Sequence, residues 1–102
     1  MLPPVLMEKE FSLFHFWMDE TVQDGLSYDN ELFCRLCTLS SEYRAQLYHY
    51  ACRLGQKDSI VITTSNAHCS LWVSLRSPNL GHLKAQQIDE DSINEFLELS
   101  ID

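Results

Sequence analysis

Four side chains of types that bind zinc occur in two short motifs. Cys34 and Cys37 form a Cys-x-x-Cys pair, and His49 and Cys52 form a His-x-x-Cys pair. Three thiolates and one imidazole suit tetrahedral zinc, and each pair is close enough to chelate one ion. All four positions fall within expected helices rather than glycine-rich turns, so buried, reduced cysteine is the favoured interpretation. We therefore predict no metal and no other cofactor, with a small zinc-stabilised module that uses Cys34, Cys37, His49 and Cys52 as the alternative.

Patterns typical of catalysis are missing from the sequence. The Cys34–Cys37 motif does not follow a strand and open a helix, as a thioredoxin-like redox pair does. His68 and Cys69 are adjacent in an expected strand, where neighbouring side chains point to opposite faces. The sequence contains no phosphate-binding loop, no dinucleotide fingerprint and no metalloprotease motif. The prediction is that the protein is not an enzyme.

Aromatic side chains at polar positions are the more informative candidates. Phe16 and Tyr48 each fall on the polar side of an expected helix, and Trp72 shares the polar face of an alternating strand. Exposed aromatic residues among polar neighbours often anchor protein interfaces. A competing interpretation covers both faces of the sheet and places Trp72 in the core. The predicted partner-binding residues are Trp72, Phe16, Tyr48, Trp17, Ser70 and Ser74.

Three helices are expected to position these residues in the first half of the chain. Residues 5–23 match a helical wheel, although the aromatic-rich run 11–18 also suits a strand, and this alternative stays open. Residues 29–39 place leucines at helical spacing. Residues 41–54 combine a serine N-cap, an apolar stripe and a following glycine.

The second half of the chain changes to a two-residue period. Residues 59–88 predict an antiparallel β-hairpin or three-stranded sheet, with the third strand near 82–88. An aspartate then caps a C-terminal helix at about 90–100. The predicted fold class is α+β, in a single domain spanning residues 1–102, with residues 1–4 flexible.

Composition excludes several classes of partner. The chain has 102 residues, a formal net charge of −8 and a sequence pI near 4.7. Neutralising phosphates requires clustered lysine and arginine, so direct nucleic-acid binding and binding to anionic membranes are not expected. The first residues lack the basic start and apolar run of an export signal, which predicts a cytoplasmic protein with reduced cysteines.

These observations favour a non-catalytic protein-interaction module. We expect a small assembly chaperone, adaptor or regulatory subunit that binds a partner's tail or surface through aromatic residues or a sheet edge. The second hypothesis is an acidic inhibitor or nucleic-acid mimic that occupies a basic groove. The partner is expected to be a protein, and a homodimer is left open.

Overall fold

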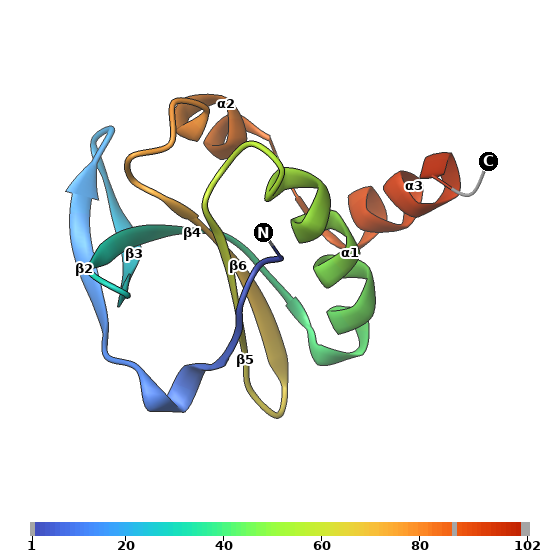
Figure 1. The fold of residues 1–102 in the computed structure, drawn as a ribbon, viewed down its shortest axis with the longest axis horizontal. Helices are drawn as coiled ribbons and strands as arrows, with labels where there is room; N and C mark the ends of the chain where they lie inside the picture. Colours follow the sequence, from blue (N-terminus) through green and yellow to red (C-terminus); the bar gives the residue numbers. More distant parts are fainter. Residues whose placement is uncertain (1, 87, 101–102) are drawn as a thin grey trace.

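The computed structural model describes residues 2–86 and 88–100. Its strands are β1 (Val5–Met7), β2 (Leu13–Met18), β3 (Thr21–Tyr28), β4 (Glu31–Ser40), β5 (Ile60–Thr64) and β6 (His68–Ser74). Its α-helices are α1 (Arg44–Leu54), α2 (Leu80–Ala85) and α3 (Glu90–Ser100), as Figure 1 shows. Two short 3-10 helices, η1 (Glu8–Glu10) and η2 (Ser41–Tyr43), lie before β2 and α1.

The strands form one mixed sheet of six, in the order β1-β5-β6-β4-β3-β2. Successive strands β2, β3 and β4 pair antiparallel, as do β4 with β6 and β5 with β6. Strand β1 runs parallel to β5. The two edges of the sheet are therefore β1 and β2.

Two-residue turns close both hairpins of the β2–β3–β4 meander. Asp19 and Glu20 join β2 to β3 with φ values of 52° and 66°, and Asp29 and Asn30 join β3 to β4 with 51° and 62°. Positive φ at both central positions is the type I′ pattern, whose twist matches that of the flanking strands. Aspartate and asparagine tolerate this left-handed conformation because their short side chains bond locally.

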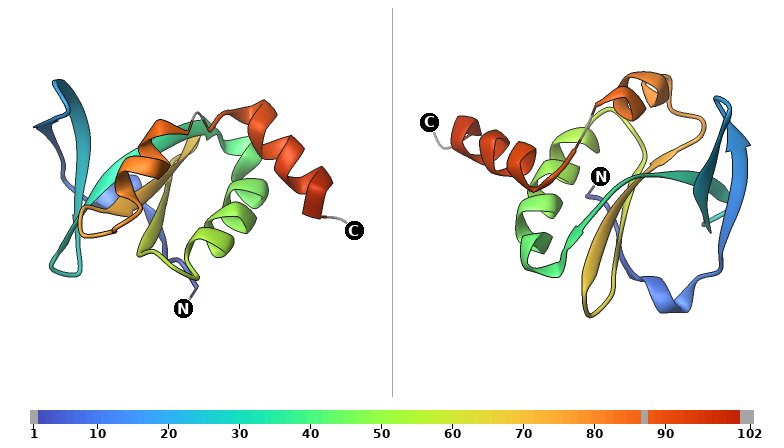
Figure 2. Two further views of the ribbon diagram at one scale, coloured as in Figure 1. Left: turned by 90° about the horizontal axis from the view of Figure 1, so that it is seen from above. Right: turned by 180° about the vertical axis from the view of Figure 1, so that it is seen from behind.

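Apolar residues lie on both faces of the sheet centre. The helices cover one face, which we call the helix-covered face, and α1, α2 and α3 contribute Leu47, Leu83 and Ile93 to its core. The opposite face carries a second cluster, made by Leu26, Phe33, Val61 and Trp72. Figure 2 shows the β2–β3 hairpin on the side of the molecule away from α1 and α3.

The connection between the two edge strands bends the sheet. Residues 8–12 join Met7 at the end of β1 to Leu13 at the start of β2, a path that spans at most about 21 Å. A flat sheet would separate its outer strands by five strand spacings, about 24 Å. The sheet must therefore curve, and it curves towards Trp72, because Phe11 of the connection packs on that cluster. We call this side the concave face.

Two of the helices predicted in the first half of the chain are wrong. Residues 5–23 form β1, η1, β2 and the start of β3, and residues 29–39 lie in the β3–β4 turn and β4. The strand alternative for residues 11–18 matches β2. In β4, the pairing register shifts between Arg35 and Cys37. This bulge breaks the strict alternation of a strand, so the leucine spacing looked helical in the sequence.

The predicted three-stranded sheet at 59–88 is also wrong. Its first two strands are β5 and β6, but they belong to a sheet of six, and residues 80–85 form α2 instead of a third strand. The structure is α+β, with α1 inside the range 41–54 and α3 at Glu90–Ser100. At the N-terminus, the Pro4 carbonyl accepts a hydrogen bond of 3.0 Å from the Ile62 amide.

Candidate protein-interaction site

The β2–β3 hairpin carries the largest exposed aromatic residue in the described chain. Trp17 is 71% exposed, and its cross-strand partner Val22 is 63% exposed. Leu13 lies on the same face of β2 and is 39% exposed. The three side chains follow the two-residue period of a strand, so they face one way. We call Leu13, Trp17 and Val22 the hairpin surface.

The other face of β2 is held by contact with β3. Phe14 lies opposite Gly25, and a Cβ atom on Gly25 would overlap the Phe14 ring. The Phe14 and Phe16 ring centroids are 6.0 Å apart. A glycine beneath an aromatic ring restores some of the packing that the missing side chain loses. Phe14, Phe16 and Met18 are therefore half-buried, whereas Leu13 and Trp17 are exposed.

Strand β2 is an edge without the usual protection against pairing. Residues 13–18 contain no lysine, arginine, aspartate or glutamate, and the far side of β2 has no strand partner in the described sheet. An edge strand presents unpaired amide and carbonyl groups, and proteins commonly guard such edges with charged residues. Strand β2 therefore offers backbone hydrogen-bonding groups next to exposed apolar side chains.

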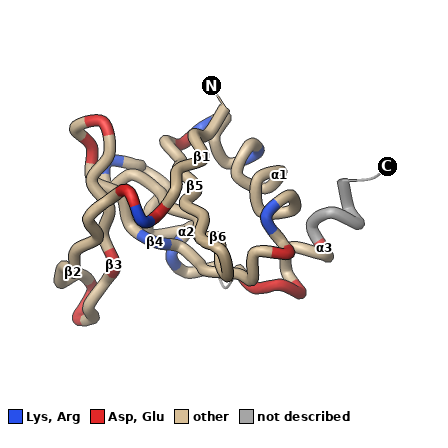
Figure 3. Tube along the Cα trace, turned by 90° about the horizontal axis from the view of Figure 1, so that it is seen from below, with Lys and Arg blue, Asp and Glu red and all other residues tan. Residues whose placement is uncertain are grey.

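Acidic residues surround this uncharged strand. Residues 10–34 contain six aspartates and glutamates and no lysine or arginine. Figure 3 shows acidic residues at the ends of the β2–β3 hairpin. Within the hairpin, His15 Nε2 lies 3.2 Å from Asp24 Oδ1. This segment carries most of the net charge of −8, so its field favours cationic partners.

Trp72 lies inside the protein, at the centre of the concave face. Its exposed fraction is 0%, and its indole Nε1 donates a hydrogen bond of 2.8 Å to Thr63 Oγ1. The guanidinium carbon of Arg35 lies 4.5 Å from the centre of its ring. Burial removes Trp72 from any surface that a partner could contact, so the predicted role of Trp72 in binding has no support in this geometry.

Arg35 closes the concave face over Trp72. It donates hydrogen bonds to Glu8 Oε1 at 3.2 Å, Thr38 Oγ1 at 2.9 Å and Ser70 Oγ at 3.2 Å. Its Nε lies 3.2 Å from Asp24 Oδ2, although the angle there does not make a hydrogen bond. Arg35 thus connects η1, β3, β4 and β6. Because Ser70 is 2% exposed and bonded here, it is not a surface contact.

The other predicted binding residues lie in different places. Ser74 is 1% exposed and donates a hydrogen bond to Glu31. Tyr48 lies on α1, half-buried against the helix-covered core. Phe16 is half-buried on the back of the hairpin. Of the six predicted residues, only Trp17 lies on the hairpin surface, and the structure does not bring Trp17 together with Tyr48, Ser70, Ser74 or Trp72.

The four zinc-ligand candidates do not form a metal site. Cys34 is buried in β4, with its Sγ 3.9 Å from Gln23 Oε1, whereas His49 and Cys52 lie on α1. Burial raises the pKa of the Cys37 thiol to about 12, which opposes the thiolate form that binds zinc. Within residues 2–86 and 88–100, no group of three histidine, cysteine or acidic side chains is placed to hold a metal ion.

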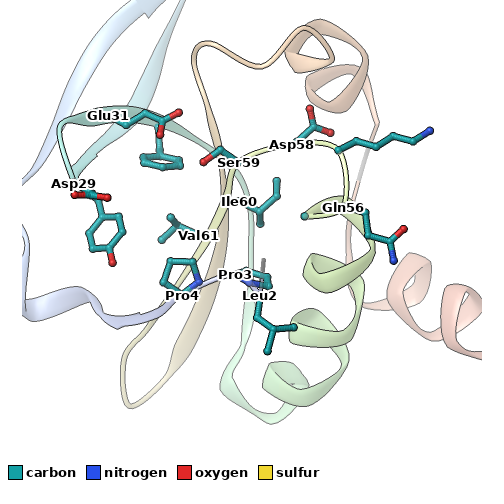
Figure 4. A pocket seen from close by; sticks show the side chains of 14 residues that line it. Leu2, Pro3, Pro4, Asp29, Glu31, Gln56, Asp58, Ser59, Ile60 and Val61 are labelled. Carbon is teal, nitrogen blue, oxygen red and sulfur yellow. The ribbon is translucent and has the colours of Figure 1, made fainter.

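A pocket of about 510 Å³ lies beside the β3–β4 turn. In Figure 4, Asp29 and Glu31 lie on one side, Asp58 on the other, and residues 2–4 close the near wall. Glu31 accepts a hydrogen bond from Ser74, and Asp58 accepts hydrogen bonds from the turn before α2. Two of the three carboxylates therefore have partners that stabilise the fold itself.

Sequence reasoning missed Leu13, Val22 and Gly25. A predicted β-hairpin over residues 13–28 would have placed these three residues on neighbouring strands. The turn residues Asp19 and Glu20, however, lack the glycine that usually marks a type I′ turn. The available signal was the β-favouring composition of residues 11–18.

No helix among the described residues is both long enough and apolar enough to cross a bilayer. No protein family model, curated protein or solved structure matches the chain.

Proposed function

We propose that the protein is a non-catalytic interaction module that binds another protein through the β2–β3 hairpin. The observation that carries the proposal is the 71% exposure of Trp17 on an uncharged edge strand. Tryptophan is among the residues that contribute most to protein interfaces when a partner buries it. The roles that fit this property are those of a small assembly chaperone, an adaptor or a regulatory subunit.

The exposed apolar area of the hairpin supports this proposal. Trp17 and Val22 lie opposite each other, and Leu13 continues the same face. A single exposed leucine needs no explanation, but grouped large apolar residues with a polar rim typically mark an interaction surface. Asp19 and Glu20 supply that rim at the end of the hairpin, where both are exposed.

The test is capture from the native lysate with the tagged chain and two variants. Trp17→Ala removes the centre of the hairpin surface, whereas Leu32→Ala removes a 47% exposed residue from the interior strand β4. We expect Trp17→Ala to weaken retention of a stoichiometric partner by roughly tenfold or more, and Leu32→Ala to leave it unchanged. Equal retention by Trp17→Ala and the unmodified chain would remove the hairpin from the proposal.

The acidic-mimic hypothesis remains a second candidate because residues 10–34 are acidic without a single lysine or arginine. A mimic would bind a basic groove mainly by charge, so its complex should dissociate above about 0.5 M salt. A complex anchored by Trp17 should persist at that salt concentration. A salt series applied to the captured partner therefore separates the two functions.

A further inference from the structure

We propose that the partner presents an extended segment, apolar in the middle and with lysine or arginine at both ends, which pairs with β2 as a seventh strand. This inference rests on the function proposed above and specifies how the hairpin binds. Three features of the molecule support it: the free edge of β2, the largely apolar character of its faces, where five of six residues are apolar, and the acidic residues at both its ends.

The free edge sets the length and shape of the segment. Strand β2 has six residues, so its edge extends for about 20 Å and matches a partner strand of similar length. An added strand places alternate side chains on the two faces of the sheet. On one face they would meet Leu13 and Trp17 with His15 between them, and on the other Phe14, Phe16 and Met18. Both faces therefore favour apolar partner residues, except beside His15 and its cross-strand partner Asp24.

The charged residues set the ends of the segment. Glu10 precedes β2, and Asp19 and Glu20 follow it directly. All three are exposed, and none forms an ion pair among the described residues. A partner strand that extends past β2 at either end thus meets a carboxylate. Because both ends are acidic, lysine or arginine at the ends of the segment would fit either strand direction.

A second copy of the chain fits this edge poorly. Pairing of β2 with β2 would bring together two hairpins that each contain an excess of acidic residues and no lysine or arginine between residues 10 and 34. Like charges placed side by side oppose association. The charge of the hairpin therefore favours a basic partner over self-association.

The first test is selection from a displayed library of random decapeptides. Peptides are enriched on the unmodified chain and depleted on Trp17→Ala, so that only binders dependent on the hairpin remain. We expect enriched peptides to carry β-branched or aromatic residues in the middle and lysine or arginine at both ends. Enrichment of apolar peptides without terminal basic residues would overturn this inference and leave the proposed function intact. No enrichment over Trp17→Ala would overturn both.

The second test neutralises the acidic residues at one end of the strand. Asp19→Asn with Glu20→Gln removes two charges and keeps side chains of similar size, and asparagine tolerates the positive φ at position 19. We expect affinity for an enriched peptide to fall about three- to tenfold at low salt, and by less at high salt. The control, Glu42→Gln, neutralises an exposed acid beside α1. An equal loss in both variants would overturn the assignment of the basic ends.

The third test examines backbone pairing directly. Amide hydrogen exchange of residues 13–18, measured with and without the peptide, reports whether the outward amides of β2 become protected. We expect protection on β2, and little change on the opposite edge, β1. Peptide binding that shifts the Trp17 indole signal without protecting β2 amides would overturn strand addition. Sedimentation that shows a dimer abolished by Trp17→Ala would instead identify a second copy as the occupant.

Discussion

The two tryptophans of the chain lie in two contrasting regions of one sheet. Trp72 lies at the sheet centre with an exposed fraction of 0%, and Trp17 lies on the edge hairpin with 71%. Both belong to antiparallel strands, and both lie on the same side of the sheet as Leu26. The regions differ in what covers them, because the 8–12 connection and Arg35 close over Trp72 and nothing described closes over Trp17.

This difference shows that strand patterning alone does not decide exposure. A strand residue becomes buried only when a second element reaches its face, and here a five-residue connection and one arginine do so at the centre. The hairpin extends beyond their reach. Its apolar face is therefore available for a partner, and the centre of the sheet provides the stability that holds the hairpin in place.

The largest expected effect is that of Trp72→Ala. Removing a fully buried indole leaves a cavity, loses the hydrogen bond to Thr63 and takes away the surface on which Arg35 stacks. We expect the free energy of unfolding to fall by about 3–5 kcal/mol, measured by urea denaturation. A loss below about 1 kcal/mol would contradict the burial of Trp72.

Removing the charge that closes the concave face should have the next largest effect. Arg35→Met keeps an unbranched chain over Trp72 but removes the cation beside Glu8 and Asp24, so that only His15 remains next to Asp24. We expect a loss of about 2 kcal/mol in the free energy of unfolding. Arg76→Met, at an exposed arginine, is the matched control and should change stability by less than about 0.5 kcal/mol. Equal effects of the two substitutions would show that Arg35 does not hold the face closed.

The buried cysteines predict how stability depends on pH. Burial raises the pKa of Cys37 to about 12, and it also raises the pKa values of Cys34 and Cys69. An unfolded thiol is about half deprotonated near pH 9, whereas the folded chain keeps these protons, so the free energy of unfolding should fall as the pH rises. Between pH 9 and 10 the loss should be about 1 kcal/mol for Cys37 alone, with further losses from Cys34 and Cys69. Below about pH 8 these thiols should have no effect. Cys37→Ala should reduce the slope between pH 9 and 10, and an unchanged slope would contradict the burial of this thiol.

Gly25→Ala tests the back of the hairpin. The added Cβ would overlap the ring of Phe14, which must then leave its position on β3. We expect a loss of about 1 kcal/mol and faster amide exchange in β2. Gly81→Ala in α2 is the contrasting control, because its Cβ would meet nothing within 4 Å and alanine favours helices by about 0.5–1 kcal/mol. Destabilisation by both substitutions would argue against a specific contact at Gly25.

The smallest expected effect on stability is that of Trp17. We expect Trp17→Phe to change the free energy of unfolding by less than about 0.5 kcal/mol, as is usual for exposed positions. It should also remove most of the acrylamide quenching of tryptophan fluorescence, because the remaining Trp72 is buried. Trp72→Phe should leave quenching strong. Strong quenching in Trp17→Phe would reverse the comparison between the two regions.

The sequence allowed prediction of elements whose signals are local. Helix α1 ends at the glycine that the sequence offered, Gly55, although it begins after Tyr43 and not at a capping serine. Strand β6 carries Cys69, Leu71 and Val73 at alternate positions, the two-residue period that predicted a strand. Residues 13–18 were ambiguous because five of the six are apolar, which leaves no period to separate helix from strand. In β4, the bulge near Leu36 interrupts the two-residue period, so the sequence did not show the pattern of a strand.

The candidate site depended on contacts that sequence patterns do not encode. The burial of Trp72 depends on Glu8 and Arg35. Both residues lie far from Trp72 along the chain and meet each other only in the folded sheet. Trp17 could be proposed as an aromatic contact, but its pairing with Val22 required the Asp19–Glu20 turn. A turn without glycine is a weak sequence signal for a hairpin.

The parallel pairing of β1 with β5 also constrains the order in which the protein can fold during synthesis. Val5 pairs with Ile62, so β1 leaves the ribosome several seconds before its partner, at roughly 5–20 residues per second. The β2–β3–β4 meander needs only neighbouring residues and can form during this interval, since local contacts cost less chain entropy. Strand β1 must therefore wait for β5, and early folding of the meander would place the β2 edge on the nascent chain before the sheet is complete.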